Sequence, residues 1–137
     1  QDYPTNENIT AAFKNNELTH SKIRFQRFSE LYQQTPAIQL GGVTIAWLQQ
    51  AIMTTRNIFN DLDKIKIPLL VLQSGGDTVV DNKAQDQFCQ KLHQLQAHSC
   101  PEGKAVVIDQ AFHELFLESD KYREPALTKA LAWFLTH

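Results

Sequence analysis

Two short apolar runs in the second half of the chain constrain the fold more than any other feature of the sequence. They span residues 69–72 and 105–108, and neither contains a polar side chain. Uninterrupted runs of this length are typical of strands that are buried on both faces of a parallel sheet. Between them, residues 82–95 repeat apolar side chains near helical spacing. We therefore predict a strand, a helix and a second strand, joined by a right-handed crossover.

The predicted sheet needs more strands than this sequence supplies. A final helix is expected over residues 124–135, after a loop over residues 110–120. The alternation of strands and helices places the chain in the α/β class. Two strands do not make a stable parallel sheet by themselves, so their free edges are expected to pair with strands from elsewhere.

The first half of the chain, up to about residue 60, is polar and helix-prone instead. Residues 1–16 are rich in asparagine, and no regular element is expected there. Apolar side chains at helical spacing predict a helix over residues 19–34, capped by Thr19 or Ser21. A second helix is predicted over residues 43–59. Its expected buried stripe consists of Ile45, Leu48, Ile52 and Phe59.

The composition excludes several classes of function. The chain of 137 residues has a formal net charge of -2, so it has no basic excess that would attract nucleic acid. Its apolar runs are far shorter than the ~20 residues of a membrane helix. Its start lacks the features of a signal peptide, and without an initiator methionine it is expected to be a processed or trimmed piece. Cys89 and Cys100 are expected to be thiols in a reduced compartment, with a single disulfide as the less favoured alternative.

Two titratable residues follow the predicted strands, at the edge where open α/β sheets bind their ligands. Asp77 comes after the first strand and His113 after the second. An aspartate that orients an imidazole, and an imidazole that accepts a proton from a nucleophile, are two of the three members of a catalytic triad. The alternatives are that Asp77 only forms an Asx turn or caps the next helix, and that His113 is a partly buried loop residue.

The two loops around these residues resemble those of a known superfamily. Residues 75–81, Gly-Gly-Asp-Thr-Val-Val-Asp, look like the aspartate loop after the penultimate strand of α/β-hydrolases. Residues 110–114, Gln-Ala-Phe-His-Glu, look like their histidine loop. The nearer resemblance is to the monoacylglycerol-lipase-like branch, and within it to bacterial lysophospholipases of the L-two type. It is supported by residues 18–21, 41–44, 79–82, 86–89 and 111–114.

The resemblance implies a serine hydrolase whose nucleophile lies in a Gly-x-Ser-x-Gly turn, followed along the chain by the aspartate and then the histidine. Asp77 and His113 match the positions of the triad aspartate and histidine, but no serine of this chain lies in such a turn. The chain thus looks like the carboxyl-terminal part of an α/β-hydrolase. Residues 1–62 match the helical cap and residues 63–137 the last two strands of the core, so this piece alone is expected to be inactive.

Substrate and partners also follow from the resemblance. The complete hydrolase is expected to cleave the acyl ester of a lysophospholipid or monoacylglycerol through an acyl-enzyme, with no metal or organic cofactor. The missing amino-terminal half, or a second copy of the chain, is expected to cover the sheet edge. A cytoplasmic location is expected, with peripheral contact with the inner membrane as an option. Lys22, Arg24 and Arg27 either contact anionic lipid head groups or form an ordinary solvated helix face.

Two other functions stay open at this point. The chain is alternatively a non-catalytic interaction module that uses the cap or the open sheet edge, or part of a hydrolase of another ester or peptide substrate. The triplet Thr19-His20-Ser21 is either a polar contact of the cap near the substrate or simply the start of a helix.

Overall fold

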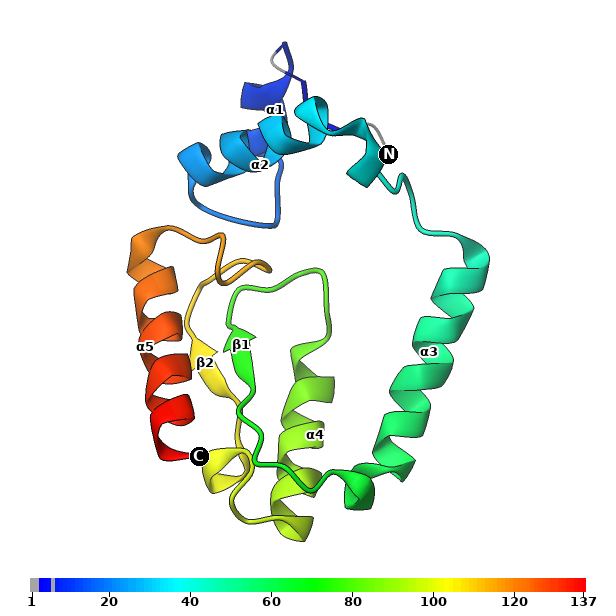
Figure 1. Cartoon of the computed structure of the whole chain (residues 1–137), viewed down its shortest axis with the longest axis vertical. Coiled ribbons are helices and arrows are strands. Elements are labelled where there is room, and N and C mark those ends of the chain that lie inside the picture. Colours follow the sequence, from blue (N-terminus) through cyan, green and yellow to red (C-terminus); the bar gives the residue numbers. More distant parts are fainter. Residues whose placement is uncertain (1–2, 6) are drawn as a thin grey trace.

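The computed structural model describes residues 3–5 and 7–137; residues 1, 2 and 6 of the predicted irregular start lie outside the described residues. The described chain is largely helical and contains a small parallel sheet (Figure 1). Its helices and strands are α1 (Ile9–Lys14), α2 (Lys22–Gln34), α3 (Ile45–Asn60), β1 (Leu72–Ser74), α4 (Asn82–Leu95), β2 (Val106–Ile108) and α5 (Asp120–Thr136). Short 3₁₀ helices cover Pro36–Ile38, Leu62–Lys64 and Pro101–Gly103.

β1 and β2 run parallel, with Leu72 opposite Val106 and Ser74 opposite Ile108. The second strand lies within the predicted run, but the first begins three residues later than the sequence suggests. The reason is that the chain before Leu72 bonds a turn instead of the neighbouring strand. The Leu69 carbonyl accepts a hydrogen bond of 2.8 Å from Cys100 N–H, which belongs to a turn. Regular pairing between strands therefore starts only at Leu72.

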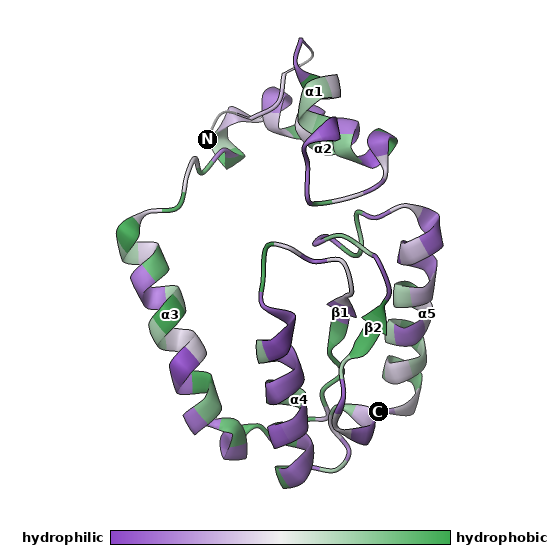
Figure 2. Cartoon of the chain, turned by 180° about the vertical axis from the view of Figure 1, so that it is seen from behind, coloured by the Kyte–Doolittle hydropathy of each residue, from purple (hydrophilic) through white to green (hydrophobic). Residues whose placement is uncertain are grey.

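One helix packs on each face of this sheet. Successive side chains of a strand point to opposite faces. Leu69 and Val71 accordingly pack in a cluster with Leu92 of α4, whereas Leu72 packs in a second cluster with Tyr122 of α5. Figures 1 and 2 show α4 beside β1 and α5 beside β2. A strand, a helix and a second strand with helices on both faces is the arrangement expected of part of an α/β sheet.

For α2 and α4 the predicted boundaries agree closely with the observed ones, and the capping residues of these helices explain why. The Ser21 side chain accepts a hydrogen bond from a backbone N–H of α2, and Asp81 does the same for α4. α5 begins at Asp120, four residues before the predicted start, and it accommodates Pro125 in its second turn. Among the described helices, none combines the length and the apolar character that a membrane crossing needs.

Three expectations about the first half and the cysteines are wrong. The start of the chain forms α1, which is stabilised because Phe13 packs against Phe25 of α2 with ring centroids 5.6 Å apart. Cys89 and Cys100 form a disulfide, because α4 and the turn after it bring their Cα atoms within 5.3 Å. The third wrong expectation is the buried stripe of α3, because this helix contains no buried residue.

α3 is exposed because the described residues provide no element against its apolar side. Ile45 is 88% exposed and Leu48 is 52% exposed. The helix stands apart from the sheet in Figure 1, and Figure 2 shows apolar segments along its length. Only its end approaches the core, where Phe59 meets Phe88 of α4 edge to face at 6.4 Å.

Candidate active site

The turn after β1 and the loop after β2 are joined where they leave the sheet. Gly75 N–H donates to the Ile108 carbonyl and Gly76 N–H to the Ala111 carbonyl, each at 2.9 Å. A side chain on either glycine would meet backbone atoms of the second loop at 3.0 Å. Glycine is therefore needed at both positions for the close approach of the two backbones.

Asp77 and His113 meet where these two loops run side by side. His113 Nδ1 lies 2.8 Å from Asp77 Oδ2. The aspartate side chain is 4% exposed and the imidazole 27%, so the contact is shielded while the ring keeps an open side. A carboxylate bonded at Nδ1 retains the proton there and leaves Nε2 as the acceptor. Within residues 3–5 and 7–137, Nε2 of His113 has no hydrogen-bond partner.

The Asp77 carboxylate is held in its ionised form. Burial acts to raise its pKa, but hydrogen bonds from His113 and from the Val79 and Val80 N–H groups outweigh burial and lower the pKa below its usual range. The two N–H groups donate to Oδ1 at 2.8 and 3.2 Å. This is the Asx turn that the sequence offered as an alternative. One oxygen thus shapes the aspartate's own loop while the other bonds the imidazole.

A segment of the first half, residues 16–20, crosses both loops; we call it the strap. His113 N–H donates to the Glu17 carbonyl at 3.2 Å, and Glu114 N–H donates to the next carbonyl of the strap at 3.0 Å. Thr78, beside Asp77, donates from Oγ1 to the Glu17 carboxylate at 2.7 Å. The strap is therefore bonded to the histidine loop and to the aspartate loop.

Glu118 joins the strap to the histidine loop, and the sequence patterns do not predict it. This fully buried carboxylate has Oε1 2.6 Å from His20 Nδ1 and 2.8 Å from Phe112 N. Its Oε2 accepts from His20 N–H at 3.0 Å and from Ser119 N–H at 2.7 Å. Burial acts to raise the pKa of Glu118, but these hydrogen bonds lower it below the usual range. The one available signal was a charged residue directly after the apolar run 115–117.

The Thr19-His20-Ser21 triplet begins a helix, as one of its two interpretations predicts, whereas its contact near a substrate stays a prediction. Ser21 caps α2. Thr19 is buried, and its Oγ1 donates to the Leu117 carbonyl at 2.9 Å. The His20 ring lies against the ring of Phe112, with centroids 3.8 Å apart. The triplet thus begins a helix and also contacts the loop that contains His113.

The three basic residues of α2 are in different surroundings. Arg24 donates to the Glu118 carbonyl and forms an ion pair with Asp120 at the start of α5. Lys22 and Arg27 are exposed. In the described part of the chain, no three His, Cys, Asp or Glu side chains gather as a metal site would require.

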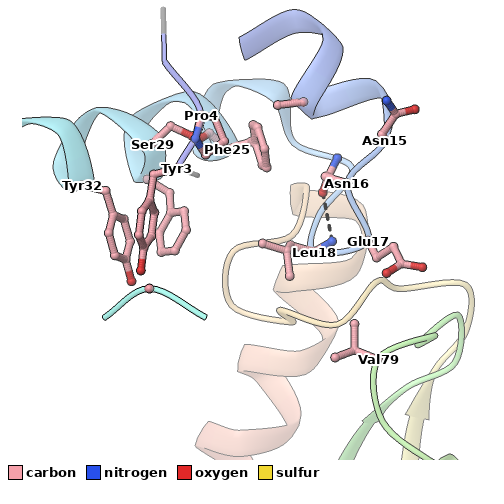
Figure 3. Close-up of a pocket in the computed structure, with 13 residues that line it drawn as sticks. Tyr3, Pro4, Asn15, Asn16, Glu17, Leu18, Phe25, Ser29, Tyr32 and Val79 are labelled. Carbon is pink, nitrogen blue, oxygen red and sulfur yellow. Dashed lines mark hydrogen bonds between the residues drawn. The ribbon is translucent and has the colours of Figure 1, made fainter. Parts of the chain in front are cut away.

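A cavity of about 540 Å³ borders the aspartate loop (Figure 3). Its walls come from α1, the strap, α2 and the residues near the start of the chain. Tyr3 and Tyr32 stack on one side with ring centroids 4.5 Å apart, and Phe25 lies close by. Val79 lines the cavity from the aspartate loop, two residues after Asp77. Four of the residues that line it are aromatic, so we call it the aromatic cavity, and it reaches the aspartate loop at Val79.

Comparisons with known proteins identify the family of this chain. The model of the family described as serine aminopeptidase, S33, matches residues 5–120. Lysophospholipase L2 of Escherichia coli strain K12 is 34% identical over 125 residues, which are 91% of this chain and 36% of the relative. A protein described as probable lysophospholipase L2, from Haemophilus influenzae, is 34% identical over 120 residues, again 36% of its length. The chain spans about a third of the length of these curated relatives. No solved structure matches it significantly.

The family match covers both loops, the strap and most of the described elements. This chain belongs to the serine aminopeptidase S33 family of α/β-hydrolases.

Proposed function

We propose that this chain is the carboxyl-terminal part of a serine esterase that hydrolyses the acyl ester of lysophospholipids or monoacylglycerols. Residues 1–62 are its cap and residues 63–137 the end of its core; the longer protein is called the complete enzyme below. The observation that supports this proposal best is the 2.8 Å contact between Asp77 and His113 in a member of this hydrolase family. The names of the lysophospholipase relatives suggest the substrate.

In this proposal Asp77 and His113 are catalytic residues of an acyl transfer. Asp77 keeps the proton of the imidazole on Nδ1, so that Nε2 accepts the proton of the serine hydroxyl as the serine oxygen attacks the ester carbonyl. The imidazolium then gives this proton to the leaving alcohol, and an acyl-enzyme remains. Water attacks the acyl-enzyme by the same route and releases the fatty acid. The serine itself comes from outside this chain, because no serine here lies in a Gly-x-Ser-x-Gly turn.

The aromatic cavity is the proposed site for the acyl chain. Its volume of about 540 Å³ lies in the range of small-molecule pockets. Apolar walls suit a hydrocarbon chain, and the position of Val79 puts one end of the cavity near the catalytic pair. A single acyl chain fits such a cavity better than the two chains of a diacyl phospholipid.

A peptidase activity is the second candidate, because the matched family is described as serine aminopeptidase. The same Asp–His pair serves amide and ester hydrolysis, so the pair does not separate the two reactions. The aromatic cavity favours the lipid ester, since among the described residues that line it Glu17 is the one carboxylate, and it already accepts a hydrogen bond from Thr78.

The test compares three substrates with the complete enzyme and its His113→Ala variant. We expect hydrolysis of lysophosphatidylcholine or monoacylglycerol, little cleavage of an aminoacyl anilide, and loss of the esterase activity in the variant. The 137-residue chain alone is expected to hydrolyse none of them. If the complete enzyme cleaves the anilide and neither ester, its activity is that of a peptidase and the proposed esterase activity is wrong. No hydrolysis by the complete enzyme would leave a non-catalytic interaction module and overturn the proposal.

A further inference from the structure

Glu118 is a buried acid for which the proposed reaction has no direct use. Its side chain is 0% exposed, and a buried ionised carboxylate is costly unless it is well compensated. Here its two oxygens accept four hydrogen bonds, three from backbone N–H groups and one from the His20 ring. Its lowered pKa agrees with a carboxylate that stays ionised.

The donors to Glu118 come from three separate segments. His20 belongs to the strap, Phe112 to the histidine loop, and Ser119 to the start of α5. Helix capping does not explain these contacts, because Ser119 is itself the N-cap of α5 and a capping side chain accepts from N–H groups within the first turn. Glu118 instead connects the cap region to the residue that directly precedes His113. Thr19 and Arg24 support the same junction through the Leu117 and Glu118 carbonyls.

We propose that Glu118 is a positioning residue for His113. It fixes the position of the imidazole relative to the aromatic cavity. The hydrogen bond to Phe112 N–H holds the backbone just before His113, while the two bonds to His20 hold the strap that lines the cavity. Because Glu118 acts through His113, this role rests on the proposed function. A displacement of about 1 Å at a catalytic group is enough to lower the rate by up to about 100-fold.

The Glu118→Gln variant disturbs one bond more than the others. An amide oxygen in place of Oε2 still accepts from the N–H groups of His20 and Ser119. The amide NH₂ group then replaces Oε1 and faces Phe112 N–H, where two donors oppose each other. The His20 ring can change tautomer and accept from the amide, but the backbone N–H of Phe112 cannot. The loss therefore falls on the residue next to His113.

The experiment measures kcat, KM and the proton NMR signal of His113 Nδ1–H in the complete enzyme, with the signal assigned by its absence in His113→Ala. For Glu118→Gln we expect kcat to fall on the order of 10- to 100-fold with little change in KM, and the Nδ1–H signal to broaden or shift. Glu118→Asp keeps the charge on a shorter side chain, so its kcat should lie between those of the wild type and Glu118→Gln.

Glu114→Gln is the matched control. It makes the same chemical change in the same loop, at an exposed residue next to His113. We expect its kcat and its Nδ1–H signal to equal those of the wild type.

The outcomes separate positioning from simple stabilisation. Loss of thermal stability in Glu118→Gln with unchanged kcat and an unchanged Nδ1–H signal would overturn the positioning role. If Glu118→Gln does not fold, Glu118→Asp decides by the same two readouts, and wild-type values for both would overturn it. If His113→Ala retains full turnover, the proposed function fails, while the NMR signal still reports whether Glu118 positions the imidazole.

Discussion

Two imidazole–carboxylate pairs flank one loop of this molecule, and they differ in what the second oxygen of each carboxylate binds. His113 lies 2.8 Å from Asp77, and His20 lies 2.6 Å from Glu118. The second carboxylate oxygen of Asp77 accepts hydrogen bonds from N–H groups of its own turn. Glu118 accepts hydrogen bonds from three different segments of the chain. The first arrangement orients a ring, whereas the second joins pieces of structure.

Because both pairs have a short contact between histidine and an acid, the contact alone does not distinguish them. What separates the pairs is where each lies relative to the sheet. Asp77 and His113 follow β1 and β2, at the carboxyl edge of the strands, where α/β proteins place their reacting groups. His20 and Glu118 lie farther along, where the strap meets the start of α5. Variants of each pair should therefore affect different properties.

The largest effect is expected for His113→Ala in the complete enzyme. Loss of the general base of a triad lowers kcat on the order of 10⁶-fold in a well-studied serine protease, and we expect a loss of similar size here. Steady-state ester hydrolysis measures the effect, with His98→Ala, an exposed histidine, as the control. Turnover within about tenfold of the wild type would remove His113 from the reaction.

Asp77→Asn should have the next largest effect, on the order of 10⁴-fold in kcat. The amide can donate but no longer stabilises the imidazolium, and it favours the wrong tautomer of His113. Its oxygen can still accept from Val79 and Val80, so the turn should persist and circular dichroism should be unchanged. A rate near that of the wild type would show that the pair is structural, like the His20–Glu118 pair.

The sequence predicts the Asp77–His113 pair but not the His20–Glu118 pair, for physical reasons. Asp77 and His113 can be found because glycine and strand patterns mark the loops in which they lie. The junction of Glu118 with the strap and α2 depends on contacts between residues 94 to 98 positions apart, which no local pattern encodes. The exposed side of α3 is a related case, because periodicity identifies an apolar stripe but does not show what covers it. The sequence makes the disulfide the less favoured alternative for the same reason, since spacing alone does not place Cys89 beside Cys100.

The acid stability of the complete enzyme should distinguish the two carboxylates from ordinary surface acids. The pKa values of Asp77 and Glu118 are lowered in the folded protein, so both contribute stability above their unfolded pKa values of about 4. That stability is lost as the pH falls through the lowered folded values. Glu118→Gln should destabilise the fold by about 1–3 kcal/mol at neutral pH, because Phe112 N–H loses its acceptor.

Thermal melting between about pH 7 and pH 3 checks this expectation. The difference in melting temperature between the wild type and Glu118→Gln should be greatest above about pH 5 and shrink below pH 4, as the wild-type carboxylate takes up its proton. A difference that does not depend on pH would mean that the charge of Glu118 contributes nothing to the junction.

The smallest effect is expected for His20→Phe. The new ring keeps the packing against Phe112, where the centroids are 3.8 Å apart, but it removes the Nδ1 donor to Glu118. Glu118 retains its three backbone donors, so we expect a loss of about 1 kcal/mol in the free energy of unfolding and a kcat close to that of the wild type. Chemical denaturation and ester hydrolysis measure the two quantities. A fall in kcat as large as that of Asp77→Asn would mean that His20 takes part in the reaction. The two pairs would then not differ in function, because both imidazoles would be needed for catalysis.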